Sequence, residues 1–254
     1  MTRAVITAFA RSPFHFAHKG ALARTRPDDL VAQVIAGLVQ RSGLDPALIE
    51  DVAMGCAMPE GEQGLNVARL AGQLAGLPIS VGGMTINRFC GSGQQAVTFG
   101  AMGVGSGHQN LVVGCGVESM SRPTRNGTDG FHANNEHLLA THPQVPQGLS
   151  ADLIATLDGY TREQCDALGL ESQRRAAAAI KEGRFDRSLV PVYHDDGTLA
   201  PYAAGASIAF APEIVVPALM AIQTRYPHTY GRYGFWDAFN PSFNFPDVRL
   251  THGR

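Results

Sequence analysis

The sequence predicts an α/β fold in which a mostly parallel sheet carries helices on both faces and a loop excursion follows. Short apolar runs alternate with segments of helical spacing from the N-terminus to about Gly114, a pattern typical of parallel sheets. The 254 residues are 44% hydrophobic and 17% charged, which indicates a globular chain rather than a disordered one. A chain of this size buries about 70–75% of its unfolded surface and needs no disulfide or metal to fold.

The predicted strands and helices alternate along the first half of the chain. A strand is predicted over residues 4–8, and a helix begins at Pro27 because apolar residues from Leu30 to Leu38 follow at helical spacing. Further strands are predicted over residues 51–57, 84–89 and 111–114, and further helices over residues 66–74 and 93–102. We therefore expect an N-terminal α/β core over residues 1–118.

The second half of the chain divides into two parts. Residues 119–151 are rich in Gly, Pro, Asn, Ser and Thr, so a long excursion with little regular structure is predicted there. Thr161 and Gln164 form a capping-box signature, which predicts a helix to about Glu182. We expect a loop region with this long helix over residues 119–192, and a foreign-looking, aromatic-rich tail over residues 193–254.

Charge and cysteine content exclude several classes of protein. The chain has 20 Lys and Arg against 22 Asp and Glu, with no long run of either sign, so the basic footprint of a nucleic-acid-binding protein is missing. No apolar stretch approaches the roughly 20 residues that cross a bilayer, and no signal peptide is recognisable, so we expect a cytoplasmic protein without a membrane partner. The four cysteines, Cys56, Cys90, Cys115 and Cys165, have neither zinc-ligand spacing nor the pattern of a disulfide framework.

Cys90 stands on the turn between a predicted strand and a predicted helix. At a helix N-terminus the free amide groups and the helix dipole favour the thiolate, which is the nucleophilic form of cysteine. The neighbouring Gly91, Ser92 and Gly93 allow a substrate to approach the backbone closely and offer N–H donors for a developing oxyanion. This arrangement suits acyl transfer.

Two other interpretations of the same segment remain open at this point. Cys90 is a small buried residue beside a tight turn in the first of them. In the second, Gly91-x-Gly93-x-x-Ala96 is a loose dinucleotide fingerprint, with Glu118 about 20 residues on as a ribose ligand.

Five blocks of the sequence, in order, resemble the N-terminal part of the thiolases, particularly the acetyl-CoA acetyltransferase and 3-ketoacyl-CoA thiolase branch. The blocks are residues 59–69, 87–93, 114–121, 147–151 and 161–177, and the resemblance covers about residues 1–192. The resemblance implies the thiolase fold, with a CoA-binding-type loop region over residues 119–192. It also implies that Cys90 is the nucleophile that accepts the acyl group from a coenzyme A thioester, which is a substrate, and that no other cofactor is needed.

The resemblance also bears on the neighbouring residues. Cys56 and Cys115 are then packing residues, and Glu118 is a structural or loop-anchoring carboxylate. Arg174 and Arg175 either meet the phosphates of coenzyme A or form a solvated face, and the second is favoured. Five histidines are expected to be solvated loop residues: His15, His18, His132, His137 and His142.

Three motifs that the family places in its second half do not occur in this sequence. They are the Gly-His-Pro histidine that activates the nucleophile, an Asn-Glu-Ala-Phe segment and a Cys-x-Gly cysteine. His228 and His252 match none of them. We therefore expect the C-terminal half of the thiolase fold to be absent and catalysis to be impaired, since the acid/base groups are missing.

Residues 194–254 resemble a fragment of a glucoamylase-like, glucan-cleaving family with an (α/α)-barrel fold. Glu213 and Asp237 would be its candidate carboxylates, although a fragment cannot form the barrel that separates them correctly. The leading hypothesis is a thiolase-type acyltransferase that works through a cysteine acyl-enzyme and is expected to be a homo-oligomer. A truncated, non-catalytic acyl-CoA-binding or dimerisation module is the alternative, and a glycan-acting protein is the third hypothesis.

Overall fold

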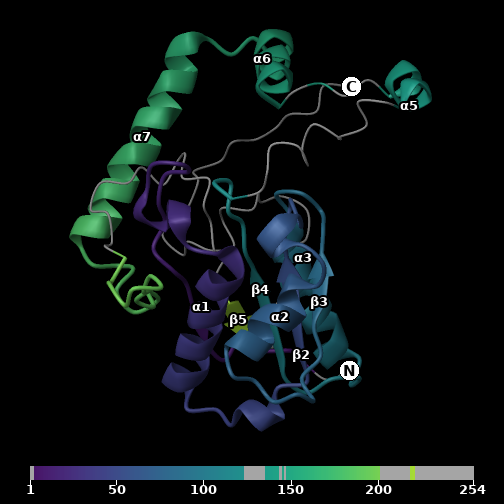
Figure 1. The fold of residues 1–254 in the computed structure, drawn as a ribbon. Helices are drawn as coiled ribbons and strands as arrows, with labels where there is room; N and C mark the ends of the chain where they lie inside the picture. The colour runs from purple at the N-terminus through teal and green to yellow at the C-terminus, as the bar shows by residue number, and fades with distance from the viewer. Residues whose placement is uncertain (1–2, 123–134, 143–144, 146, 201–217, 221–254) are drawn as a thin grey trace.

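The computed structural model describes residues 3–122, 135–142, 145, 147–200 and 218–220 (Figure 1). The strands lie in the order of the chain at Phe9–Ala10 (β1), Asp51–Gly55 (β2), Met84–Ile86 (β3), Val112–Gly116 (β4) and Ala218–Met220 (β5). The α-helices are Pro27–Ser42 (α1), Val67–Leu74 (α2), Ser92–Gly105 (α3), Glu136–Thr141 (α5), Gln147–Asp158 (α6) and Arg162–Lys181 (α7). Short 3₁₀ turns occupy Ala21–Arg24 (η1), Pro46–Leu48 (η2) and Gly61–Gln63 (η3).

The strands among the described residues form one sheet in the order β1-β5-β4-β2-β3. Strand β2 pairs in parallel with both β3 and β4, whereas β5 pairs antiparallel with β1 and β4. The predicted α/β class is therefore confirmed. The parallel part of the sheet consists of β2, β3 and β4, which α2 and α3 connect along the chain. These parallel strands place their carboxyl ends at one edge of the sheet.

The prediction of a strand over residues 4–8 was wrong. Phe9 and Ala10 form the strand instead, because they are opposite Leu219 and Ala218 of β5. A strand exists only where another strand supplies hydrogen bonds, and an apolar run in the sequence does not reveal that partner.

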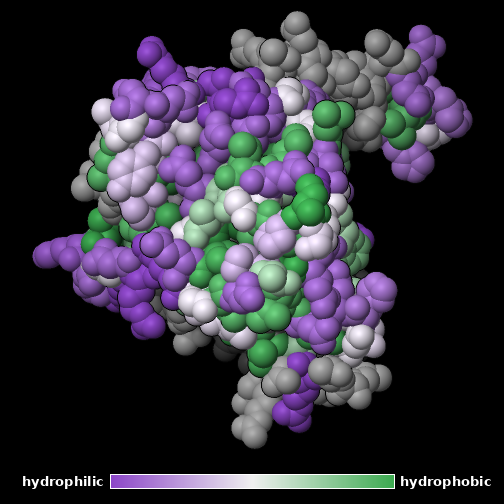
Figure 2. All heavy atoms as spheres, turned by 60° about the horizontal axis from the view of Figure 1, so that its bottom comes forward, coloured by the Kyte–Doolittle hydropathy of each residue, from purple (hydrophilic) through white to green (hydrophobic). Residues whose placement is uncertain are grey.

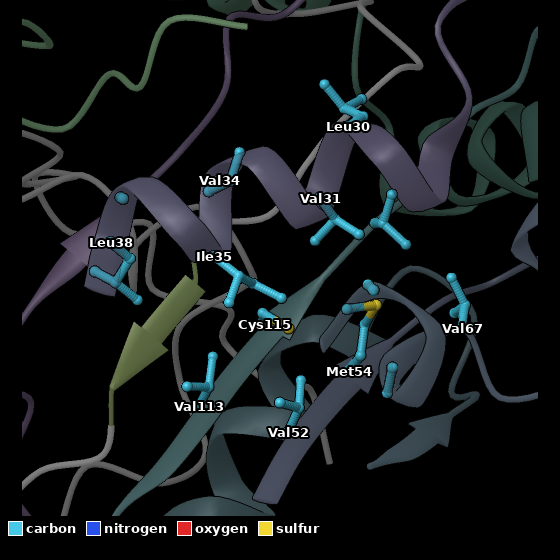
Figure 3. Close-up of a cluster of buried hydrophobic side chains, with 14 of the residues drawn as sticks. Leu30, Val31, Val34, Ile35, Leu38, Val52, Met54, Val67, Val113 and Cys115 are labelled. Atoms are coloured by element: carbon cyan, nitrogen blue, oxygen red, sulfur yellow. The ribbon is translucent and has the colours of Figure 1, made fainter. Parts of the chain in front are cut away.

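Helices cover both faces of the sheet because the strand residues alternate in direction. Val52 and Met54 of β2 and Val113 and Cys115 of β4 belong to the larger core cluster, together with apolar residues of α1 and α2. Figure 3 shows Val31, Ile35 and Leu38 of α1 pointing toward these strand residues. Ala53 and Val112 point the other way, into a smaller cluster with Ala96 and Val104 of α3.

The face that carries α3 is lined by very small residues. A Cβ on Gly55 would overlap the backbone of Ser92 and Gly93, and a Cβ on Gly114 would lie 3.0 Å from the Val97 Cα. The backbone of α3 therefore packs directly on β2 and β4. This close approach fixes the position of the first turn of α3.

Local sequence signals begin and end the helices, and the start at Pro27 and the capping box at Thr161 are as predicted. Pro27 is the first residue of α1, Asp28 and Asp29 lie in its first turn, and Gly43 ends it with a φ of +66°. The Asn66 side chain caps α2 by accepting a hydrogen bond from the Arg69 amide. The predicted capping box between Thr161 and Gln164 is present at the start of α7.

Helices α5 and α6 correct the prediction of little regular structure over residues 119–151. Asn135 caps α5 by accepting a hydrogen bond from the Leu138 amide at 2.8 Å, and α6 begins at Gln147. Neither helix has a buried residue, and both lie apart from the α/β body in Figure 1. The high content of Gly, Pro, Asn, Ser and Thr over residues 119–151 explains why composition alone indicated loops.

The segment after α7 returns to the α/β body. Arg11 is paired with this segment through its backbone, since the Arg11 amide donates to Ser188 O and the Val190 amide donates to Arg11 O. The Tyr193 amide donates to the Gln33 side chain of α1 at 2.8 Å, and Ala200 is buried. The backbone up to Ala200 is therefore attached to the core. No helix among the described residues is long and apolar enough to span a membrane.

Candidate active site

Cys90 lies between the end of β3 at Ile86 and the start of α3 at Ser92, and its side chain is exposed. The predicted position of this cysteine on a strand-to-helix turn is thus correct, and the interpretation as a buried packing residue is wrong. Gly91 is the N-cap of α3 and offers no side chain to cap the helix. Cys90 therefore directly precedes the N-cap of α3.

Hydrogen bonds within the turn hold Cys90 in place. The Gly91 amide donates to Arg88 O at 3.1 Å, and the Ser92 amide donates to Phe89 O at 3.0 Å. The buried Ser92 hydroxyl accepts from the Arg88 amide at 2.8 Å and donates to Phe89 O at 2.5 Å. Phe89 has a φ of +49°, a left-handed conformation that costs a bulky residue of the order of 1 kcal/mol and persists only where its surroundings enforce it.

The turn narrows the choice of oxyanion donors. The amides of Gly91 and Ser92, both predicted as donors, are used within the turn. Within the described part of the chain, the amides of Cys90 and Gly93 donate to no protein acceptor. The Gly93 nitrogen lies against Gly55 of β2, so the Cys90 amide is the better-placed donor for a group bound at the thiol.

An open hollow lies beside Cys90 on the outer side of α3. Arg88, Phe89, Gly91, Gln94, Gln95 and Thr98 line it. Phe89 is half exposed there, with 54% of its surface accessible. The hollow thus combines an aromatic ring, one cation and amide side chains next to the first turn of the helix.

Glu118 anchors the loop that follows β2. Its carboxylate accepts hydrogen bonds from the Ala57 amide at 2.6 Å, the Met58 amide at 3.3 Å and the Gln63 side chain at 2.7 Å. Burial raises the pKa of Glu118, and these hydrogen bonds oppose that rise. The carboxylate is occupied by protein donors, which supports the loop-anchoring role and argues against the ribose ligand of a dinucleotide site.

The other cysteines do not share the environment of Cys90. Burial is the main reason that the pKa of Cys56 rises to about 12, and the nearby Glu118 carboxylate adds to it. Burial also raises the pKa of Cys115, which lies on β4. Both are packing residues, as predicted, while Cys165 is exposed on α7.

The histidines fall into three groups. His15 is only 3% exposed, so the prediction of a solvated residue was wrong: residues 16–20 turn back, and Gly20 packs against the His15 side chain. His18, His137 and His142 are exposed, although His137 lies on α5 rather than in a loop. His132 lies outside the described residues. In the described ranges no histidine is hydrogen-bonded to the Cys90 thiol.

Arg174 and Arg175 lie in the second half of α7. Arg174 is exposed, and Arg175 pairs with Glu171 one turn away at 2.7 Å. This geometry is that of a solvated helix face, the interpretation favoured from the sequence.

Asn87 belongs to the block over residues 87–93 but had no role assigned from the sequence, and its side chain ties the Cys90 turn to the loop after β2. Its Oδ1 accepts from the Phe89 amide at 2.8 Å, and its Nδ2 donates to Ala57 O at 3.1 Å. An asparagine two residues before a turn amide is the pattern of an Asx-turn, and this local signal was available in the sequence.

Comparison with known proteins identifies what this chain is similar to. The family model "Thiolase, N-terminal domain" matches residues 4–200. A 3-ketoacyl-CoA thiolase of Bacillus subtilis (strain 168) is 39% identical over 196 residues, which are 76% of this chain and 49% of the relative. A 3-ketoacyl-CoA thiolase of Vibrio vulnificus (strain CMCP6) is 38% identical over 203 residues, 78% of this chain and 52% of the relative. This chain therefore spans about half the length of these curated relatives.

A solved structure and a second family model add to this. The acetyl-CoA acetyltransferase of Bacillus anthracis superposes with a TM-score of 0.73 and 26% identity, over 88% of this chain and 66% of that chain. The family model described as "Putative glucoamylase" matches residues 160–252. The glucoamylase match begins at residue 160, whereas the resemblance noted from the sequence begins at residue 194. It overlaps the thiolase match over residues 160–200.

Proposed function

This chain belongs to the thiolase family, and we propose on that premise that it is an acyltransferase in which Cys90 receives the acyl group of a coenzyme A thioester. The observation that carries the proposal is the exposed Cys90 thiol at the first turn of α3, beside an amide of its own that is not engaged in the turn. The 3-ketoacyl-CoA thiolases at 38–39% identity support an acyl-CoA or 3-ketoacyl-CoA substrate.

The proposed first step is the transfer of the acyl group to sulfur. The Cys90 thiolate adds to the thioester carbonyl, a carbon–sulfur bond forms, and the carbonyl electron pair moves to oxygen, where the Cys90 amide stabilises it. The oxyanion then collapses, and the bond between the carbonyl carbon and the coenzyme A sulfur breaks. Coenzyme A leaves as a thiolate and takes up a proton, and the acyl-enzyme remains.

We propose that the 254-residue chain acylates more readily than it turns over. The sequence contains no Gly-His-Pro, Asn-Glu-Ala-Phe or Cys-x-Gly motif, so the family's groups for activating the nucleophile and completing the reaction have no counterpart in it. A non-catalytic module that binds acyl-CoA or dimerises is the alternative, and it predicts no covalent adduct.

Intact-protein mass after incubation with acetyl-CoA tests this proposal. One acetyl adduct is expected on the wild type, released by hydroxylamine as a thioester would be, and none on Cys90→Ala. Cys165→Ala is the matched control, because Cys165 is the second exposed cysteine, and it should acetylate like the wild type. An adduct that survives in Cys90→Ala, or no adduct on the wild type, would contradict the assignment of Cys90 as acyl acceptor.

A second candidate function rests on the glucoamylase family match over residues 160–252. Glu213 and Asp237, its candidate carboxylates, lie outside the described residues. Glucan binding by the full chain, lost on deletion of residues 194–254, would support a glycan-acting tail. Absence of glucan binding by the full chain would exclude this second function.

We propose the cytoplasm as the compartment and a homo-oligomer as the assembly. All four cysteines are free thiols, which supports a reducing compartment.

A further inference from the structure

A continuous series of hydrogen bonds joins the ends of three parallel strands to the Cys90 turn. Glu118, two residues beyond β4, accepts the Ala57 amide at 2.6 Å. Ala57, two residues beyond β2, accepts the Asn87 Nδ2 donor through its carbonyl at 3.1 Å. Asn87, directly after β3, accepts the Phe89 amide through Oδ1 at 2.8 Å. Three loops at one edge of the sheet are thereby held in a fixed relation.

We infer that Asn87 is a positioning residue for Cys90, which orients the thiol by holding the left-handed turn against the loop anchored by Glu118. The inference rests on the proposed function of Cys90 and adds a role for a residue that does not itself touch the acyl group. Both polar atoms of the Asn87 side chain are used, one toward each loop. An apolar side chain would therefore release both ends of the connection at once.

The strained residue explains why this connection matters. Phe89, with its φ of +49°, directly precedes Cys90, so its ψ sets the direction of the Cys90 amide and of the Cα–Cβ bond. An unfavourable backbone conformation relaxes when a contact that enforces it is removed. Ser92 holds the carbonyl side of Phe89, and Asn87 holds the amide side. With Asn87 truncated, the Cys90 amide and thiol no longer keep one orientation relative to the first turn of α3.

The anchor at the other end is rigid. Gln63 is only 1% exposed, and its side chain donates both to Glu118 and to Met58 O, each at 2.7 Å, while its Oε1 accepts from the Ser119 amide at 3.0 Å. Gln63 thus holds Glu118, which accepts the Ala57 amide, while the Ala57 carbonyl accepts from Asn87. Asn87 transmits this rigidity to the turn, because Ala57 O is the group to which it donates.

The test compares two reactions of Cys90 in the full chain. Acylation by acetyl-CoA requires an oriented thiol, whereas alkylation by iodoacetamide needs only an exposed one. Asn87→Ala should slow acylation by about tenfold or more, since small displacements at a reacting centre cost up to about a hundredfold, and change alkylation by less than about twofold. Asn87→Asp keeps the acceptor for Phe89 but loses the donor to Ala57, so its acylation rate should lie between those of wild type and Asn87→Ala.

Asn110→Ala is the matched control. Asn110 also joins two segments through its side chain, which donates to Glu50 at 2.8 Å, and it precedes β4 at the opposite end of that strand. It should leave both reactions unchanged. Equal slowing of acylation and alkylation in Asn87→Ala, or reaction of the buried Cys56 and Cys115 with iodoacetamide, would show a general structural defect and overturn the inference. An unchanged acylation rate in Asn87→Ala would also overturn the inference.

Amide hydrogen exchange separates this inference from the proposed function. If the wild type forms no acetyl adduct, acylation fails as the function of Cys90, and exchange at Phe89 and Gly91 then decides the positioning role, since the amides of both are hydrogen-bonded in the turn. Asn87→Ala should speed exchange at these two amides by about tenfold relative to Asn110→Ala, because local opening becomes easier. Exchange at the wild-type rate would overturn the inference, whatever the outcome with acetyl-CoA.

Discussion

At the scale of single residues, burial separates the cysteines of this chain into two kinds. Cys56 and Cys115 are covered by the sheet and its helices, and burial raises the pKa of each thiol. Cys90 and Cys165 are exposed. A thiolate is the reactive form, so burial of Cys56 and Cys115 limits both their access to reagents and their ionisation.

Native alkylation should therefore be selective. We expect iodoacetamide at neutral pH to modify Cys90 and Cys165 in the folded chain and to leave Cys56 and Cys115 unmodified, while all four react in denaturant. Peptide mass spectrometry of native and denatured samples measures this. Modification of Cys115 at the rate of Cys165 under native conditions would contradict the packing of β4.

Gly55 is the residue on which the position of α3 depends most directly. Gly55→Ala should destabilise the fold by about 1–3 kcal/mol, because the new Cβ would meet the backbone of Ser92 and Gly93, which cannot rotate away as a side chain would. Urea unfolding measures the loss. Gly169→Ala is the control, since that glycine lies in α7 with open space around it and alanine is the better helix former by up to about 1 kcal/mol.

At the scale of elements, ion pairs connect segments that are distant in the sequence. Glu62 of η3 pairs with Arg26, the N-cap of α1, at 2.9 Å, and with Arg122, which follows β4. Arg26 also pairs with Asp28 of the first turn of α1 at 2.7 Å. The hydrogen bond from Arg122, with the charges of both arginines, holds the pKa of Glu62 below its usual value, against the effect of burial.

The stability that Glu62 contributes should depend on pH in one direction. A carboxyl group whose pKa is lower in the folded chain than in the unfolded one stabilises the fold above the unfolded pKa, and this contribution is lost as the pH falls through the folded pKa. Glu62→Gln should thus cost about 1 kcal/mol at pH 7, and the difference from wild type should vanish in acid. Urea unfolding of wild type and Glu62→Gln at pH 7 and in acid measures this difference in the free energy of unfolding.

Glu171→Gln provides the comparison for Glu62. Glu171 pairs with Arg175 within one exposed helix, so its removal should change stability by no more than about 0.5 kcal/mol. A cost for Glu62→Gln that persists unchanged in acid would show that the side chain acts through packing rather than charge.

At the scale of the whole molecule, apolar side chains remain exposed on the surface. The α/β body is polar over much of the face in Figure 2, but apolar patches interrupt it. Helix α6 presents Leu149, Leu153, Ile154 and Leu157 at helical spacing, all exposed. Exposed apolar surface of this kind favours association.

Self-association is the expected consequence. Light scattering of the full chain should give a mass that rises with concentration or corresponds to a stable oligomer. Leu153→Glu with Leu157→Glu should lower that mass if α6 contributes to the contact. A monodisperse monomer over the whole concentration range would contradict the expectation.

Local signals explain which parts of the fold were predictable. Pro27 and Thr161 act on the backbone within one turn of themselves, so the starts of α1 and α7 followed from the sequence. The alternation of apolar runs with segments of helical spacing predicted the parallel strands β2, β3 and β4. The turn that carries Cys90 was predicted for the same reason, since it lies between two well-marked elements.

The sequence by itself determined the α/β class, the helix ends and the place of Cys90 on a turn, because each depends on residues near one another in the chain. Only the tertiary structure decided that Phe9 and Ala10 rather than residues 4–8 form the strand, that His15 is buried, and that the Gly91 and Ser92 amides serve the turn. It also decided that Glu118, Ala57 and Asn87 meet. Contacts across 30 or more residues, such as Asn87 with Ala57, depend on how parallel strands bring their ends together, and no local pattern encodes that.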